Sequence, residues 1–237
     1  MTVTLLTIRA LLFRRRSLAL LLPVLSVPVF VGIAIVRGDV SPDSQAIIVG
    51  RLLITTVAPL VALVLAVTAI GDERESGTIV YLATARLSRW RIVAEKTLAA
   101  FVCSAVLLVP ALVAIVILGT HLGVGAPSIL RGIVGTLLVA LVYTSVFITV
   151  GLVLKRALVA GIIYILVWEG AIATVAPSAE RVSMTAWARA ISDGGIFGLQ
   201  TDLVPTQSAT SGVILLLGTT LIAVAIGTWR LNRMDLP

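Results

Sequence analysis

The chain has 237 residues, of which 59% are hydrophobic and only 12% are charged. An ordinary globular domain carries about 25% charged residues, so the composition excludes a water-soluble protein. The net charge of +7 would suit a nucleic-acid-binding protein, but the Arg and Lys residues cluster at the ends of apolar segments, where they act as topology signals. We therefore expect an all-α polytopic membrane protein and no nucleic-acid partner.

The N-terminal residues 1–16 place Val3, Leu6, Ala10 and Phe13 on one helical stripe. This pattern suits an interfacial helix that lies on the inner membrane surface. A basic lead-in that only fixes topology explains the same residues equally well. The apolar run that follows is too long for the core of a signal peptide, so we expect it to be a membrane anchor.

Six apolar runs follow, each near the roughly 20 residues that a helix needs to cross the hydrocarbon core. Lys155 and Arg156 separate the fourth run from the fifth, and a tight turn is expected there because two adjacent cations would be costly at the middle of a bilayer. Prolines inside spans should weaken or kink their helices, at Pro23, Pro28, Pro59 and Pro110. We predict a single transmembrane domain over residues 1–237, with about six spans at residues 17–36, 48–70, 97–119, 133–154, 157–176 and 212–229.

The distribution of Arg and Lys predicts the orientation. An even number of spans places both termini on one side, and if that side is the cytoplasm it holds 13 of the 18 cationic residues. This asymmetry follows the positive-inside rule, so we expect a multi-pass protein of the cell membrane with both termini in the cytoplasm. The preference for Arg over Lys points to a bacterial source. The cationic residues on the outer side are Arg37, Arg51, Arg131, Arg181 and Arg189.

Residues 71–96, between spans two and three, form the long non-spanning segment on the cytoplasmic side. Acidic residues come first, and Asp72, Glu73 and Glu75 suit the N-terminus of a short cytoplasmic helix. Gly77 marks a break or a close backbone approach. A solvated loop would also account for a bare run of charges.

The second half of this segment is basic and aromatic. Arg89, Trp90 and Arg91 suit the headgroup level of the membrane where span three begins. We expect these three residues to anchor the segment at the membrane edge.

The ordered pattern of residues 71–96 resembles the cytoplasmic loop of ABC-2 type permeases, the membrane subunits of ABC transporters. In that family an E-R-E-x-G-T-like stretch precedes a small-residue-S-R-x-x-I-x-x-K-like start of the third helix. The six-span plan extends the resemblance over nearly the whole chain. The matching residues are Glu73, Arg74, Glu75, Gly77 and Thr78 in the first part, and Ser88, Arg89, Ile92 and Lys96 in the second.

The resemblance implies that residues 72–84 form a coupling helix that docks on a separate ATPase. It also implies two permease subunits, identical or homologous, above two ATPase subunits that bind ATP and Mg. The sequence contains no G-x-x-x-x-G-K-[ST] phosphate loop, so another chain has to bind ATP. We expect a transport subunit that is not an enzyme and holds no cofactor. The residues assigned to coupling are Asp72, Glu73, Arg74, Glu75, Gly77 and Thr78.

Glu169 is the clearest ionisable residue inside a predicted span. An intramembrane carboxylate is costly unless it is protonated, paired or hydrated, so function is the default hypothesis. Arg51, near the outer end of span two, is a candidate partner at similar depth. The alternatives are a structural hydrogen bond or an interfacial residue beside Trp168. A Trp-Glu pair at this place also resembles ABC-2 permeases, which favours a shared structural role.

Residues 177–211 form the second long segment, on the outer side. The segment is too apolar for a free tail, with Val182, Met184 and Trp187 among its residues, so it should fold onto the outer surface. In ABC-2 permeases the corresponding region forms short helices that dip back and close the exit. The resemblance therefore implies a gate-like segment here.

The remaining motifs are weaker. Gly119 and Gly123 form a small-x-x-x-small pair that would let two helices approach closely. His121 is the single histidine and Cys103 the single cysteine, so a metal-ligand cluster or a disulfide framework is not expected. No Ser-His-Asp set or pair of catalytic carboxylates is visible.

The sequence thus predicts the permease subunit of an ABC-2 exporter, and three alternatives remain open. A self-sufficient secondary transporter or channel should carry inverted repeats or several intramembrane charges. A membrane-embedded enzyme should gather Asp, Glu or His at one membrane face. An assembly or sensory subunit would leave the activity of a partner ATPase unaffected by substrate.

Overall fold

The fold is seen in a computed structural model, which describes residues 20–37, 41, 45, 48–75, 88–154, 156–173, 179, 181–192 and 208–233. At residues 51 and 72–75 the description covers the backbone alone. Within these ranges the regular structure is helical and contains no strand. The predicted interfacial helix at residues 1–16 lies outside the described residues.

The helical elements follow one another in an order that matches the apolar runs of the sequence. Two of them, labelled η, are π-helical continuations of a neighbouring α-helix. In chain order the elements are α3 (Leu21–Arg37), η1 (Arg51–Val57), α5 (Ala58–Glu75), α7 (Arg89–His121), α8 (Ala126–Val153), α9 (Ala157–Ile163), η2 (Tyr164–Ile172), α12 (Met184–Ile191) and α13 (Ala209–Asn232).

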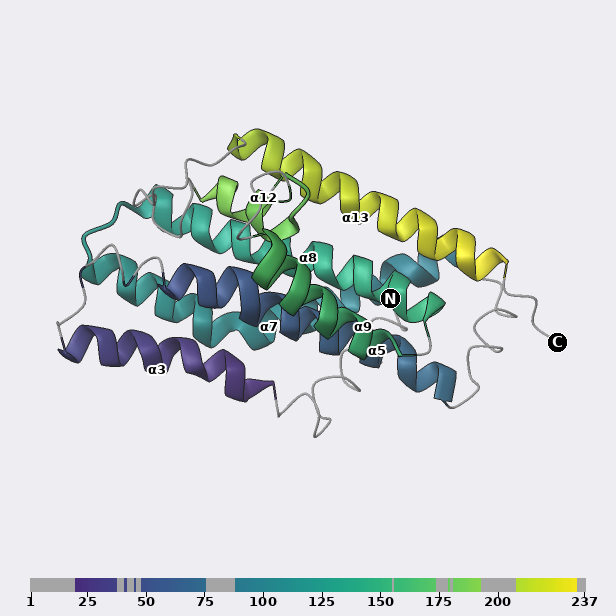
Figure 1. Ribbon diagram of the computed structural model, residues 1–237, viewed down its shortest axis with the longest axis horizontal. Coiled ribbons are helices and arrows are strands. Elements are labelled where there is room, and N and C mark those ends of the chain that lie inside the picture. The colour runs from purple at the N-terminus through teal and green to yellow at the C-terminus, as the bar shows by residue number, and fades with distance from the viewer. Residues whose placement is uncertain are drawn as a thin grey trace.

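The long helices run roughly along the long axis of the molecule, with α3 and α13 at opposite edges (Figure 1). The helix α8 is the common wall of the bundle, since it contacts α5, α7, α9, α12 and α13. The helix α3 packs on α7, whereas α13 packs on α8 and α7. The short α12 lies against α13 and α8 and touches η1.

Each predicted span coincides with an apolar helix. Four helical stretches are long and apolar enough to cross a membrane: Ile48–Gly71, Arg89–His121, Ala126–Val153 and Ala209–Asn232. Two shorter apolar helices, Leu21–Val36 and Ala157–Ile172, correspond to the first and fifth predicted spans. The chain turns between Val153 and Ala157, as predicted from the cations there. The prediction of an all-α polytopic membrane protein is confirmed.

The third span differs from the prediction at its start. The helix α7 begins at Arg89 rather than at residue 97, and Ile92, Val93 and Lys96 in its first turns are buried. Arg, Glu and Lys are good helix formers, so the charges that end an apolar run do not end the helix. The hydrophobic span is therefore only part of the longer helix α7.

The C-terminus of α7 corrects the expectation that Gly123 lets a second helix approach closely. Gly123 has a φ of +68°, and a Cβ added there would meet nothing within 4 Å. The amide of Val124 donates to the Gly119 carbonyl at 2.9 Å and that of Gly123 to Thr120 at 3.2 Å, which is a Schellman motif. Gly123 thus ends a helix and does not admit a neighbouring one.

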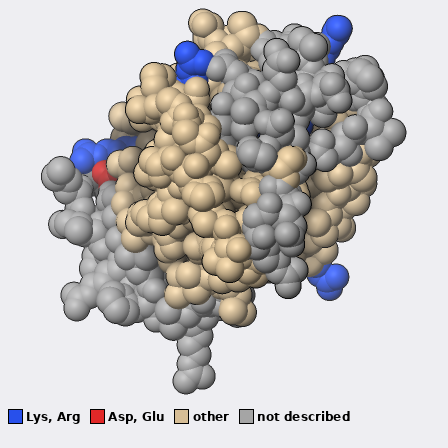
Figure 2. Space-filling model, turned by 90° about the vertical axis from the view of Figure 1, so that its left-hand side faces the viewer, with Lys and Arg blue, Asp and Glu red and all other residues tan. Residues whose placement is uncertain are grey.

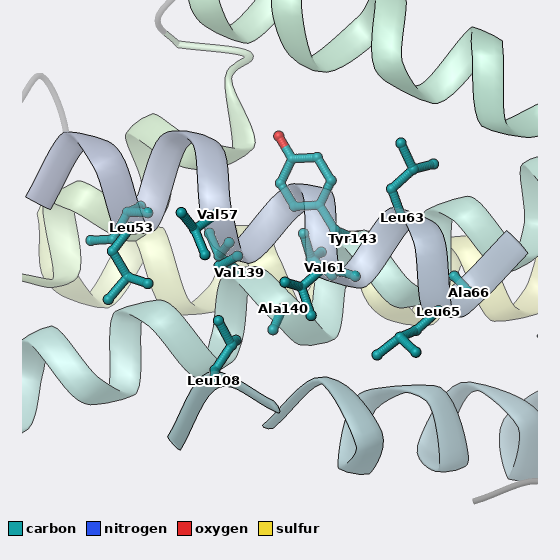
Figure 3. Close-up of a cluster of buried hydrophobic side chains, with 14 of the residues drawn as sticks. Leu53, Val57, Val61, Leu63, Leu65, Ala66, Leu108, Val139, Ala140 and Tyr143 are labelled. Carbon is teal, nitrogen blue, oxygen red and sulfur yellow. The ribbon is translucent and has the colours of Figure 1, made fainter. Parts of the chain in front are cut away.

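The buried core joins η1 and α5 to α7 and α8. Figure 3 shows aliphatic side chains of α5 facing Leu108 of α7 and Val139 and Ala140 of α8. Tyr143 packs at the edge of this cluster, with its hydroxyl directed away from the labelled aliphatic side chains. Because lipid chains are as apolar as these residues, close packing rather than the hydrophobic effect holds such helices together.

The helix α13 turns a narrow face toward the bundle and a broad apolar face outward. Its buried residues are mostly small, namely Gly212, Leu216, Ala223, Gly227 and Leu231. The opposite face carries exposed Ile214, Leu221 and Ile222, among others. In an end-on view the described surface is mostly uncharged, with Lys and Arg at its margins (Figure 2). The apolar outer face of α13, which runs along the side of the bundle, suits contact with lipid.

Candidate functional site

Two irregular helical segments lie side by side near α12. The amide of Ala58 donates to the Leu53 carbonyl, and the amide of Ala173 donates to the Trp168 carbonyl, so both bonds span five residues as in a π-helix. The segments η1 and η2 contact each other, and α12 contacts η1. Pro59 stands two residues after the end of η1 and cannot donate a helical hydrogen bond, which accounts for the irregular turn before it.

Glu169 lies on η2 and is buried, with 1% of its surface exposed. Its Oε1 accepts hydrogen bonds from the Tyr164 hydroxyl at 3.2 Å and from the Met184 amide at 3.1 Å. Its Oε2 accepts from the hydroxyls of Ser183 at 2.5 Å and Thr185 at 2.7 Å. A carboxylate has about four acceptor sites, so these four donors satisfy an ionised Glu169 without a cation.

The donors are grouped because they stand at the beginning of α12. Ser183 is the N-cap of this helix, and its Oγ accepts from the Ala186 amide at 3.1 Å. The amides of a first helical turn have no partner inside the helix and carry a partial positive charge. The Glu169 carboxylate meets one of them, that of Met184, so it acts as a second cap supplied by another helix.

Two tyrosines complete the surroundings of the carboxylate. The rings of Tyr143 and Tyr164 lie 6.4 Å apart between their centres. Tyr143 is fully buried on α8 within electrostatic reach of Glu169, yet its hydroxyl meets the geometry of a hydrogen bond with no described residue. The carboxylate therefore touches or faces groups from η2, α8 and α12.

The helix α12 fits between α8 and α13 because two glycines let its backbone come close. A Cβ added to Gly135 of α8 would lie 3.0 Å from the Ala188 carbonyl oxygen. A Cβ added to Gly212 of α13 would lie 2.5 Å from the Trp187 carbonyl oxygen, closer than real contacts allow. We call this surrounding of α12, formed by Gly135, Gly212 and the Glu169 carboxylate, the α12 socket.

Within the ranges that the structure describes, the four groups hydrogen-bonded to Glu169 all donate to its carboxylate, so the site is suited to holding this side chain in place. Among the described residues, no group of three His, Cys, Asp or Glu side chains lies together as a metal site. Cys103 is buried on α7, and His121 lies in the last turn of α7. The hydrogen bonds around Glu169 fit a positioning role.

The opposite end of the bundle, where α7 begins and α13 ends, carries cations; we call it the Arg89 end. Nη1 of Arg89 donates to the Leu231 carbonyl at 3.0 Å, which ties α7 to the last turn of α13. Nζ of the buried Lys96 donates to the Ala69 carbonyl at 3.1 Å and ties α7 to α5. Trp90 is 60% exposed.

The structure also places part of the predicted coupling segment at the Arg89 end. Asp72, Glu73, Arg74 and Glu75 form the last turn of α5. The expectation that the acidic residues begin a separate short helix is therefore wrong for this stretch, because α5 continues through them. Gly77 and Thr78 lie outside the described residues.

The partners of Glu169 differ from the one that the sequence predicted. Arg51 lies in η1, but its side chain is outside the described part of the chain, so an Arg51–Glu169 pair stays a prediction. Sequence reasoning missed Tyr164, Ser183 and Thr185 as partners. The signal that could have found two of them is the Ser-x-Thr pattern at 183–185, since Ser at the start of an amphipathic segment is a typical N-cap.

Comparison with known proteins gives one family. The model of a family described as ABC-2 family transporter protein matches residues 13–236. This range includes all the helices described above, α12 and Glu169 among them. Comparison with curated proteins gives no match.

Proposed function

Because the chain belongs to the ABC-2 family of transporter proteins as a membrane permease subunit, we propose that it serves an exporter driven by ATP hydrolysis in a separate subunit. The observation that carries the proposal is the family match across all six apolar helices. The sequence has no phosphate loop, so ATP and Mg belong to the partner. The permease supplies the path and the partner supplies the energy.

The connection between α5 and α7 is the proposed contact with the ATPase. The helix α5 reaches Glu75 and α7 begins at Arg89, so two rigid helices lead directly into residues 76–88. Lys96 joins these two helices through its bond to the Ala69 carbonyl. A push on the connecting segment would therefore move α5 and α7 together.

The coupling residues of the proposal are those of the family pattern. Asp72, Glu73, Arg74 and Glu75 stand in the last turn of α5, next to Gly77 and Thr78 in the connection. Acidic side chains at a helix C-terminus are unfavourable for the helix itself. That cost is understandable if a basic surface of the ATPase receives them.

The proposed assembly contains two permease subunits, identical or homologous, and two ATPase subunits. The Arg89 end faces the cytoplasm, as do both termini, and the α12 end faces outward in a bacterial cell membrane. The positive-inside rule supports this orientation. Each nucleotide-driven closure of the ATPases would then tilt α5 and α7 and change access from inward to outward.

The test is co-purification from the native membrane. The solubilised wild-type chain should retain an ATPase, and the double variant Glu73→Ala with Glu75→Ala should lose it or leave its activity uncoupled from substrate. The matched control removes two carboxylates on the other side of the membrane, Asp39→Ala with Asp43→Ala, and should retain the ATPase. A wild-type chain that arrives alone and moves solute without ATP would support a secondary transporter instead.

A further inference from the structure

Within the part of the chain that the structure describes, the Glu169 side chain joins span five to the start of α12, and we infer that Glu169 is a latch residue that positions α12 and keeps this end of the bundle closed. The meaning of closure rests on the proposed function, because a permease needs an exit that opens and shuts. The docking of α12 does not depend on any transport role.

The hydrogen bonds connect two different elements. Three of the four donors to the carboxylate belong to residues 183–185 at the start of α12, and only the Tyr164 hydroxyl comes from η2 itself. These three donors lie 14 to 16 residues beyond Glu169 in the sequence. The carboxylate therefore bridges span five and α12 rather than stabilising its own helix.

The rest of α12 also packs closely against its neighbours. Ala188 and Ile191 are buried, and the backbone of the helix rests against Gly135 and Gly212. In a membrane such contacts act through van der Waals packing without a hydrophobic driving force between helices. The polar bridge at Glu169 thus adds a directional tie that favours one docked position of α12 along span five.

The hydrogen bonds between Glu169 and the start of α12 favour two discrete arrangements, in which α12 is either docked or undocked. Charge-assisted hydrogen bonds are about twice as strong as neutral ones, and a buried carboxylate that loses its donors becomes costly in a low-dielectric interior. A partly undocked α12 would leave Glu169 buried and incompletely satisfied. Docked and fully hydrated arrangements are therefore favoured over intermediates between them.

The π-helical segments η1 and η2 lie beside the latch, and a change in η2 would move the Glu169 side chain. A π-helical turn often marks a functional site within an α-helix, and η2 carries Glu169 itself. Small shifts at an effector site are amplified because packed interfaces change between discrete arrangements. A shift of η2 would pull the carboxylate from the start of α12, or carry α12 with it.

The isosteric variant Glu169→Gln weakens the latch without changing its shape. The Met184 amide can only donate, so it requires the amide oxygen of the new side chain. The new NH2 group then faces the hydroxyls of Ser183 and Thr185, which must turn from donors into acceptors. The variant loses the negative charge as well, so α12 should undock more often.

The experiment measures how often α12 opens, using a thiol reporter in the purified full chain. Ser192 is 2% exposed at the end of α12, and Ser192→Cys is nearly isosteric. The natural thiol is removed by Cys103→Ala, since the chain has one cysteine. A second reporter, Ser104→Cys on α7, is 0% exposed. A bulky, charged maleimide then labels each reporter in separate samples.

The latch predicts a local response. Glu169→Gln should raise the labelling rate of the Ser192→Cys reporter at least about tenfold, as expected for losing hydrogen bonds to a charged group, and leave the Ser104→Cys reporter unchanged. Thr185→Val removes one donor and should give a smaller increase, which keeps the test open if the Gln variant does not fold. Thr97→Val, whose hydroxyl bonds within its own helix, should change neither reporter.

Two results would overturn the inference. One is an unchanged labelling rate of the Ser192→Cys reporter in both Glu169→Gln and Thr185→Val. The other is an equal rise of both reporters, which would mean that Glu169 only stabilises the whole fold. Because the purified chain carries no ATPase in this test, either failure would leave the co-purification result and the proposed transport function standing.

Discussion

At the two ends of the bundle, side chains of opposite charge satisfy the unpaired backbone groups of helix termini. At the α12 end, the Glu169 carboxylate meets the start of a helix, where amides are unpaired and partial charge is positive. At the Arg89 end, the Arg89 guanidinium meets the Leu231 carbonyl in the last turn of α13, where partial charge is negative. Each end thus satisfies helix termini with side chains from another helix.

The difference between the ends lies in how the bonds are grouped. At the α12 end a single carboxylate gathers four donors, so removing it affects all of them. At the Arg89 end Arg89 and Lys96 make separate bonds to different helices. Bonds that share a residue act as a unit, and separate ones add independently. The α12 end is therefore built as a latch, and the Arg89 end as individual ties.

The largest effect should come from Glu169→Ala, which leaves buried donors without an acceptor. We expect a loss of at least about 3 kcal/mol in the free energy of unfolding, measured by denaturant or thermal unfolding in detergent. Glu95→Ala is the matched control, since that carboxylate pairs with Arg91 within one helix and the Arg91 side chain is 51% exposed. Similar losses in the two variants would contradict the comparison between the ends.

The next largest loss of stability should come from a substitution in the α12 socket. It is tested by two glycine substitutions on the same helix, α13. Gly212→Ala places a Cβ against the Trp187 carbonyl and should destabilise the docked α12 by about 1–3 kcal/mol. Gly218→Ala on the same helix meets nothing within 4 Å and should cause no loss. Unfolding in detergent measures both. If the two substitutions behave alike, the close approach at Gly212 does not hold α12.

Much of the fold follows from the sequence because membrane spans are specified by local composition. The six apolar runs and the turn between Val153 and Ala157 depend only on residues near in sequence. The ends of helices are less predictable, since charged residues end a span without ending the helix. The last turn of α5 at 72–75 and the first turns of α7 from Arg89 show this.

At the candidate site, Glu169 could be predicted from the sequence, but its hydrogen-bond partners could not. Glu169 stands out because a carboxylate in an apolar run is costly, and that cost is visible in sequence. In the sequence, Arg51 is the cation that could offset this charge. The structure satisfies it with neutral hydroxyls and an amide, and such common groups carry no distinctive signal until Ser183 and Thr185 are brought to it in space.

Lys96→Met should change the unfolding free energy less than Glu169→Ala and Gly212→Ala do, but it should clearly reduce coupled transport. The Ala69 carbonyl keeps its place in α5, and the substitution removes the ammonium that needs a partner, so the change in unfolding free energy should be only about 1 kcal/mol. The link between α5 and α7 is lost, so solute moved per ATP hydrolysed should fall in the reconstituted complex. Thr97→Val, the neighbouring residue with a bond inside α7, should leave this ratio unchanged. An unchanged ratio in Lys96→Met would argue against α5 and α7 moving together.

The smallest changes in unfolding free energy should distinguish a hydrogen bond between two helices from an ion pair within one helix. Arg89→Ala breaks the bond to the Leu231 carbonyl and should lower the unfolding free energy by about 1 kcal/mol. Arg91→Ala breaks the 2.9 Å pair with Glu95 one turn away, which should contribute about 0.5 kcal/mol or less and weaken further in high salt. The double variant should show the sum of the two losses, because the two arginines contact different partners. A loss well above that sum, measured by unfolding in detergent, would mean that the Arg89 end is a cooperative network like the α12 end, and the contrast between the two ends would disappear.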